Sequence, residues 1–324
     1  MKRRQVLVLL AGGAAFRAGL AHAQATPVIG YLSSKDEDSE RGIMAAIWRG
    51  LNEMGFAEGK NVSFIYAWSA GDYNRLPDLA AGLVKHNVDV IAASGLPAAL
   101  AAKAATSRIP IVFRLAIDPV AFNLTQSFDK PGGNATGVTM LFDPLTTKKL
   151  QLLKELVPGV TKIGFLINPN NQNAASHRDH AQRAADDLNI SLSVLTVGQP
   201  NDLDGAFAAA RKAELGSILV GDDPLFDVLN PKLVRTAAQY SIPTMYYVRD
   251  FVVSGGLISY GPSFDEMAKQ VGIYLGRILK GATPSDLPVQ QPTTFQLVIN
   301  LKTARILGLK VPATLLAAAD DVIE

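Results

Sequence analysis

Residues 88–120 constrain the fold more than any other stretch, because they read as one strand, loop, helix and strand unit. Val88–Ala92 is an apolar run of strand length, and Ser94–Pro97 ends it with turn residues. Pro97 suits the first position of a helix, and the alanine-rich run after it favours helix. A second apolar strand follows at Ile109–Phe113. Because the helix begins at the carboxyl edge of a sheet, its free N–H groups are expected where open α/β sheets bind ligands.

A second unit of the same kind begins at Gly216, about 130 residues further on. It repeats the strand, the loop with Gly and Pro, the helix, and a strand entered through an Ile-Pro pair. The strand Val28–Leu32 likewise recurs as Lys162–Leu166. Buried parallel strands resemble one another, but two matches at one offset are harder to obtain by chance. We therefore expect an α/β fold of two similar, Rossmann-like lobes with parallel sheets.

The order of the elements predicts that the chain crosses between the lobes three times. The first crossing is expected at Asp143-Pro144, the second near Tyr246–Asp250, and the third in the Pro- and Ser-rich stretch 283–292. Phe251–Tyr260 and the helix Phe264–Leu279 are then expected to return to the first lobe. The expected division is 24–142 with 251–284 for the first lobe, and 143–250 with 285–324 for the second.

The first 23 residues have the pattern of an export signal. A basic start at residues 2–4 precedes the apolar run Val6–Ala15, and Ala21-His22-Ala23 is a small-x-small cleavage site. The Arg3-Arg4 pair leaves the twin-arginine and the general secretory routes open. No later segment reaches the roughly 20 apolar residues that a membrane span needs. We therefore expect a periplasmic protein that is not embedded in the membrane and starts at Gln24.

Composition and motifs exclude several classes of protein. Four of the 31 basic residues lie in the export signal, which leaves 27 basic against 29 acidic residues. This net charge near −2 argues against a nucleic-acid partner, and the absence of cysteine excludes disulfides and thiolate chemistry. No common nucleotide-binding, hydrolase or zinc-protease motif is present. His177 and His180 lack an evident third metal ligand, so we expect no metal site. Because the motifs of enzymes and cofactor sites are missing from the sequence, we also expect no cofactor and no catalysis.

The candidate ligand-binding residues gather where the carboxyl ends of the two sheets are expected to face each other. Those of the first lobe are Ser33, Ser34, Ser94, Gly95, Leu96, Ala98, Asp118 and Pro119, and those of the second are Asn168, Asn171, Asp222, Asp223, Phe226, Tyr246, Tyr247 and Arg249. Hydroxyls, amides, a helix N-terminus and aromatic rings in one cleft are typical of a site for a small polar molecule. For each residue a cap or turn role remains open, and Asp222-Asp223 are read either as loop ligands or as a helix cap. Trp68 and Tyr73 are interpreted as covering the core rather than stacking on a ligand.

Five segments of the chain resemble one known family. They are GGNATGVT (Gly132–Thr139), LINPNN (Leu166–Asn171), GGLISYG (Gly255–Gly261), QLVINLKTARILGL (Gln296–Leu309) and ADDVIE (Ala319–Glu324). In combination they are similar to the ABC-transporter substrate-binding family that includes the tryptophan-binding lipoproteins of some Gram-positive bacteria. The resemblance extends over essentially the whole mature chain. It implies a type I periplasmic-binding-protein fold with a three-segment hinge, closure around a small ligand, and a partner permease and ATPase.

The resemblance also implies roles for single residues. In the aromatic-amino-acid binders of the family, a small-residue loop and helix N-terminus receives the ligand carboxylate, and an acid of the second lobe receives the ammonium. These places fall on Ser94, Gly95, Leu96 and Ala98, and on Asp222 or Asp223. The chain departs from the family at Arg114, an unexpected residue there, and in lacking a lipobox cysteine, which implies a free periplasmic protein.

Three functions therefore remain open from the sequence. The first is the solute-binding component of an ABC importer that closes around a small polar ligand such as an aromatic or other amino acid. The second is a binding protein for an aromatic or other carboxylic acid, which Arg114 and Arg249 would favour if both faced the cleft. The third is a sensory module that presents its closed lobes to a membrane receptor.

Overall fold

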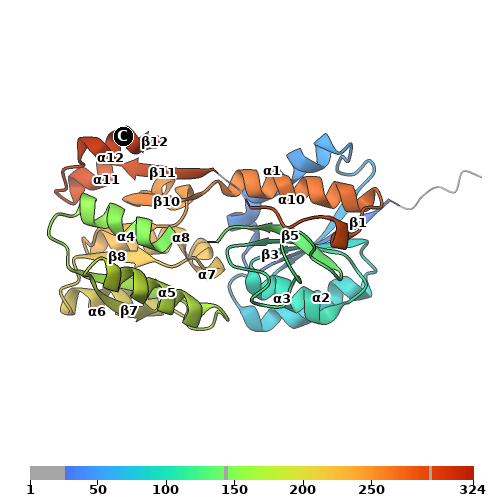
Figure 1. Ribbon diagram of the computed structural model, residues 1–324, viewed down its shortest axis with the longest axis horizontal. Helices are drawn as coiled ribbons and strands as arrows, with labels where there is room; N and C mark the ends of the chain where they lie inside the picture. Colours follow the sequence, from blue (N-terminus) through green and yellow to red (C-terminus); the bar gives the residue numbers. More distant parts are fainter. Residues whose placement is uncertain (1–25, 142–144, 292–293) are drawn as a thin grey trace, which may run out of the picture.

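The computed structural model describes residues 26–141, 145–291 and 294–324, which form two α/β lobes side by side (Figure 1). The expected export signal and the expected first crossing at Asp143-Pro144 lie outside these residues. None of the helices in the described ranges combines the length and the apolar character that a membrane crossing requires.

The first lobe is built on a parallel sheet with the strand order β2-β1-β3-β4-β5. Its strands are β1 (Val28–Ser33), β2 (Ser63–Trp68), β3 (Val90–Ser94), β4 (Ile111–Leu115) and β5 (Ala135–Thr139). Its helices are α1 (Glu37–Glu53), η1 (Tyr73–Arg75), α2 (Leu76–Lys85), α3 (Leu96–Ala105), α10 (Phe264–Leu279) and η2 (Pro284–Asp286). Every residue of β3, β4 and β5 is buried, as expected for strands covered on both faces.

The second lobe is built on a seven-stranded sheet with the order β12-β11-β10-β9-β8-β6-β7, parallel except between β10 and β11. Its strands are β6 (Lys162–Ile167), β7 (Ser191–Thr196), β8 (Ser217–Val220), β9 (Thr244–Tyr246), β10 (Ile258–Pro262), β11 (Phe295–Asn300) and β12 (Asp321–Ile323). Its helices are α4 (Leu145–Leu156), α5 (Ala174–Asp187), α6 (Asp202–Lys212), α7 (Pro224–Val228), α8 (Asn230–Gln239), α9 (Arg249–Val253), α11 (Leu301–Ile306) and α12 (Ala313–Ala318).

The internal repeat expected from the sequence is confirmed by the strand order. The sequence-matched strands β1 and β6 hold the same place, because β2-β1-β3-β4 in one sheet corresponds to β7-β6-β8-β9 in the other. In both sheets the loop after the third of these strands leads into a helix that begins with proline in its first turn. The two lobes therefore present equivalent loops toward each other.

The expected return of residues 251–260 to the first lobe is wrong. Residues 249–253 form α9, and β10 pairs with β9 and β11 in the second sheet. A five-residue strand does not specify by its own pattern which sheet it joins, so its partner could not be read from the sequence. The chain instead leaves the second sheet after Pro262, and α10 packs against α1, where Gly272 lies so close that a Cβ atom would be 2.1 Å from the Ile47 carbonyl.

The third crossing lies later in the chain than the expected boundary at 285. Leu287 accepts a hydrogen bond from Thr136, and Gln290 forms a bridge to Val138 on β5. We therefore call residues 26–141 and 263–291 lobe 1, and residues 145–262 and 294–324 lobe 2. With this connectivity, the first turn of α10 stands at the boundary between the lobes, and so does α7 (Figure 1).

Candidate functional site

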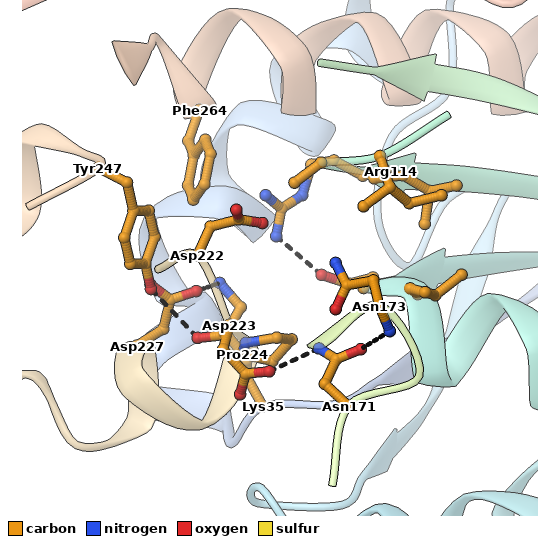
Figure 2. Close-up of a pocket in the computed structure, with 16 residues that line it drawn as sticks. Lys35, Arg114, Asn171, Asn173, Asp222, Asp223, Pro224, Asp227, Tyr247 and Phe264 are labelled. Atoms are coloured by element: carbon orange, nitrogen blue, oxygen red, sulfur yellow. Dashed lines mark hydrogen bonds and ion pairs between the residues drawn. The ribbon is translucent and has the colours of Figure 1, made fainter. Parts of the chain in front are cut away.

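A cavity lies between the lobes, at the carboxyl ends of β3 and β4 on one side and of β8 on the other. Its walls come from both lobes, and Figure 2 shows their side chains. This is the edge at which the strand, loop, helix units of the sequence are expected to bind a ligand.

The lobe 1 wall rests on Glu40, a fully buried carboxylate in the first turn of α1. It lies 3.0 Å from Lys35 Nζ and 3.2 Å from Arg114 Nη2, and it accepts hydrogen bonds from Tyr31 and Ser94 at 2.6 and 2.8 Å. Burial alone raises the pKa of Glu40, but the Lys35 and Arg114 cations outweigh it and lower the pKa to about 2. Glu40 therefore stays ionised and fixes both cations at the cavity.

Arg114 is the cation of this wall that reaches the cavity with spare hydrogen-bonding capacity. Its Nη2 donates to Ser94 Oγ at 2.8 Å, and its guanidinium lies 4.9 Å from the centre of the Phe264 ring. The side chain is 8% exposed, and its Nε has no hydrogen-bond partner among the described residues. A buried guanidinium with an unpartnered donor is suited to receive a carboxylate.

The lobe 2 wall contains a second buried carboxylate, Asp223, which caps α7. It accepts hydrogen bonds from Asn168 (3.0 Å), Asn171 (2.5 Å), the Leu225 backbone (2.8 Å) and Tyr73 of lobe 1 (2.6 Å). Burial raises the pKa of Asp223, and these neutral donors offset that effect only in part. Both oxygens are already engaged, so Asp223 is poorly placed to receive a ligand ammonium.

Asp222 and Asn173 supply acceptor atoms to the cavity from lobe 2. Figure 2 shows the Asp222 carboxylate pointing toward the Arg114 guanidinium across the cavity. His177 Nε2 lies 3.4 Å from Asp222 Oδ1 and 2.9 Å from Asn173 Nδ2. Asn173 is 3% exposed, and its Oδ1 has no hydrogen-bond partner in the described chain. Lobe 1 thus presents a donor to the cavity, and lobe 2 presents acceptors.

The rest of the cavity wall combines apolar residues with a polar contact between the lobes. Phe264 and the segment 115–117 of lobe 1 face Pro224 of lobe 2. Lys35 Nζ also lies 3.1 Å from Asp227 Oδ2 on α7, whose other oxygen accepts a hydrogen bond from Tyr247 at 2.7 Å. The ion pair between Lys35 and Asp227 joins the two lobes, so the lobes are in direct contact beside the cavity.

Seven residues named from the sequence line this cavity. They are Ser94, Gly95, Leu96, Asn171, Asp222, Asp223 and Tyr247. At the expected helix N-terminus, however, the Gly95 N–H donates to the Arg114 carbonyl and the Ala98 N–H donates to Ser34 Oγ. Most donors of α3 are therefore engaged within lobe 1, which leaves Arg114 as the better-placed partner for an anion.

The other named residues lie behind the cavity or away from it. Ser33 donates to Glu40, Ser34 caps α3, and Asn168 supports Asp223. Asp118 and Pro119 form a turn in which Asp118 accepts from the Val120 N–H. Phe226 and Tyr246 are core residues, at 0% and 1% exposed, and Arg249 pairs with Asp321 on the surface at 2.7 Å.

Five charged, polar or aromatic residues of the site were not among the ligand-binding residues named from the sequence. They are Lys35, Glu40, Asn173, Asp227 and Phe264. Glu40 has the pattern of a first-turn helix acid, and Phe264 follows the crossing that was misplaced. Within the described ranges, no group of three or more acidic or histidine side chains is placed to hold a metal ion.

Comparison with known proteins agrees with this two-lobed site. The model of the family described as ABC transporter substrate binding protein matches residues 31–323. The chain belongs to the ABC transporter substrate-binding protein family. It is accordingly a solute-binding component of an ABC importer, a class whose members bind small ligands and work with transporter components.

Three relatives are similar to this binding protein over most of its length. A conserved domain protein of Vibrio cholerae has a TM-score of 0.86 at 28% identity, covering 92% of this chain and 99% of that one. An ABC domain of Streptococcus pneumonia in complex with L-Trp has a TM-score of 0.84 at 26% identity, covering 92% and 100%. A tyrosine-binding protein of Clostridioides difficile is 26% identical over 263 residues, which are 81% of this chain and 75% of that protein. The fold of the binding protein is that of type I periplasmic binding proteins.

Proposed function

We propose that this protein binds an α-amino acid with an aromatic side chain in the periplasm and delivers it to the permease and ATPase of an ABC importer. One observation carries the proposal. Arg114 of lobe 1 and Asp222 of lobe 2 face each other across a cavity whose wall also includes Phe264 and the apolar segment 115–117 (Figure 2). An amino-acid zwitterion is the small molecule that matches one cation and one anion at short separation.

The ligand carboxylate fits the Arg114 side, where Nε is an unpartnered donor. The ammonium fits the Asp222 side, where Asn173 Oδ1 offers a further acceptor. An unpartnered buried donor and acceptor are costly unless a ligand satisfies them, so both atoms support a polar ligand. The Phe264 ring and the apolar segment 115–117 suit an aromatic side chain.

Binding of this kind explains closure. The carboxylate contacts lobe 1 and the ammonium contacts lobe 2, so the ligand makes its full set of contacts only when the lobes are together. A ligand with more contacts in the closed form shifts the population toward that form. Micromolar affinity, about −8 kcal/mol, is sufficient for capture.

The relatives support an aromatic amino acid, since one is named for tyrosine binding and another was solved with L-Trp. A carboxylic acid is the second candidate, because Lys35 and Arg114 are both cations at the cavity. Arg249 does not reach the site, which weakens that candidate. We propose no catalytic role, since no nucleophile motif or cofactor motif is present in the sequence.

The experiment is a ligand screen on protein that has been unfolded, freed of carried ligand and refolded. Melting temperatures are recorded against amino acids, aromatic acids, nucleosides and sugars, because a ligand that binds only the folded state raises the midpoint. We expect the largest shifts with Phe, Tyr or Trp. Shifts confined to acids without an ammonium group would instead establish the carboxylic-acid function.

A further inference from the structure

The loop Asp223–Leu225 of lobe 2 is inserted into lobe 1 beside the ligand cavity. Asp223 and Leu225 are 4% and 3% exposed, although they belong to a loop and helix start at the lobe boundary. Tyr73, in η1 of lobe 1, donates a hydrogen bond of 2.6 Å to Asp223 Oδ1. The other three donors to Asp223 all come from lobe 2. Asp223 is therefore held in place by its own lobe and receives one donor from the opposite lobe.

Two glycines of lobe 1 make room for this docking loop. A Cβ atom on Gly71 would lie 2.9 Å from Leu225 Cδ1, and one on Gly95 would lie 3.0 Å from Pro224 Cγ. Both glycines have positive φ, at 84° and 92°. A methyl group added at either glycine would crowd a side chain of the docking loop, Leu225 at Gly71 and Pro224 at Gly95. The hydrogen bond between Tyr73 and Asp223 and the close packing at the two glycines thus lie in the same contact between the lobes.

We propose that Tyr73 is a positioning residue for ligand binding, which acts by bonding Asp223 and so latching the docking loop in lobe 1. Tyr73 does not line the ligand cavity, and the contacts of the docking loop with Gly71 and Tyr73 require no ligand. The predicted effect of the latch on ligand affinity rests on the proposed binding function. Its effect on the position of the lobes is independent of which ligand the protein takes.

The physical reason is that the donors to Asp223 from lobe 2 keep their hydrogen bonds when the lobes separate, whereas the donor from lobe 1 does not. Asn168, Asn171 and the Leu225 N–H still bond Asp223 in an open protein, whereas Tyr73 moves away with lobe 1. Closure therefore adds one hydrogen bond to a charged acceptor and buries Leu225. Such a bond corresponds to a population change of about tenfold to a hundredfold.

The test measures the distance between the lobes in refolded, ligand-free protein. The chain has no cysteine, so Asp78→Cys on α2 and Arg183→Cys on α5 give two unique spin-label sites. We expect a closed fraction in the parent and a fraction about tenfold or more smaller in Tyr73→Phe. A parent with no closed fraction, or a closed fraction that Tyr73→Phe leaves unchanged, would overturn the latch.

A glycine pair separates docking from backbone strain. Gly71→Ala and Gly55→Ala introduce the same positive-φ strain, since both residues have φ of 84°, but Gly55 has nothing within 4 Å of its Cβ position. We expect both variants to melt at lower temperature, and only Gly71→Ala to lose closed fraction. Equal distance distributions in the two variants would count against docking at this contact between the lobes.

Calorimetry with L-tryptophan and L-tyrosine then connects the latch to affinity. We expect Tyr73→Phe to weaken binding about tenfold to a hundredfold, with the preference between the two amino acids unchanged. Unchanged affinity would contradict the positioning role. If the parent binds neither probe, the proposed ligand class is wrong, whereas the latch stands or falls on the distance measurement.

Discussion

The two walls of the cleft each contain a buried carboxylate, yet the two groups are held in opposite ways. Glu40 in lobe 1 is 0% exposed and is paired with two cations, which lower its pKa to about 2. Asp223 in lobe 2 is 4% exposed and is surrounded by neutral donors, so that burial leaves its pKa raised. Neutral hydrogen bonds satisfy a buried carboxylate without fully stabilising its charge.

The difference also separates the roles of the two lobes. The partners of Glu40 named above all belong to lobe 1, so this cluster forms when lobe 1 folds. Its link to lobe 2 is indirect, through the ion pair between Lys35 and Asp227. Asp223 gains its fourth donor, Tyr73, only when the lobes meet. One carboxylate therefore serves as a permanent scaffold for Arg114, and the other responds to closure.

The largest expected effect is on stability when the charge of Glu40 is removed. Glu40→Gln leaves two buried cations without their shared anion, so we expect the free energy of unfolding to fall by about 3–5 kcal/mol. Asp223→Asn removes a carboxylate that no cation pairs, and a smaller loss of about 1–3 kcal/mol is expected. Urea unfolding of both variants measures the two losses. Equal losses would show that the cation pairing of Glu40 does not distinguish the two walls.

The pH dependence of stability sharpens the same comparison. The pKa of Glu40 is lowered from 4.5 to about 2, so its contribution is complete above pH 4.5 and is lost as the pH falls toward 2, by about 3 kcal/mol in all. The raised pKa of Asp223 has the opposite sign, since its contribution is present below 3.8 and is lost as the pH rises through the folded-state pKa.

Urea unfolding of the parent, Glu40→Gln and Asp223→Asn across this pH range separates the two groups. We expect Glu40→Gln to flatten the acid loss and Asp223→Asn to leave it in place. An acid loss that persists unchanged in Glu40→Gln would mean that other carboxylates carry it.

Ligand affinity gives the next effect in size. Arg114→Lys keeps the positive charge but removes the planar donor set, so we expect an amino-acid ligand to bind about tenfold to a hundredfold more weakly. Arg249→Lys is the matched control, because Arg249 pairs with Asp321 away from the cavity. Titration calorimetry compares the two variants. Similar losses in both would remove Arg114 from the ligand site.

The smallest effect is expected at the surface pair itself. The Arg249 and Asp321 side chains are 47% and 39% exposed, and exposed ion pairs contribute roughly 0–1 kcal/mol. Arg249→Ala should therefore change the free energy of unfolding by no more than about 1 kcal/mol in urea unfolding. A larger loss would indicate that this pair helps hold α9 against β12.

Much of the fold follows from the sequence because it depends on local patterns. The repeated strand, loop and helix units predicted two similar sheets, and the match between Val28–Leu32 and Lys162–Leu166 located two strands that hold equivalent places, β1 and β6. The placement of β10 failed because strand pairing is a long-range property that a five-residue pattern does not encode.

The candidate site was predictable only where it consists of loops at strand ends. Ser94, Asn171 and Asp222 follow or flank buried strands, so their position could be inferred. Glu40 could not be, because its role depends on cations from a loop and from β4 that only the folded sheet brings near. The capping role of Asp223 likewise depends on neighbours, Asn168 and Asn171, that only the folded chain brings to its carboxylate.

The central claim is that the ligand is a zwitterion held between Arg114 and Asp222. Calorimetry on the refolded protein with L-tryptophan, tryptamine and indole-3-propionate tests it most directly, because the last two lack the carboxylate and the ammonium in turn. We expect the parent to bind L-tryptophan at least tenfold more tightly than either analogue. In Asp222→Asn, we expect L-tryptophan and indole-3-propionate to bind with similar affinity. A parent that binds indole-3-propionate as tightly as L-tryptophan would contradict the claim.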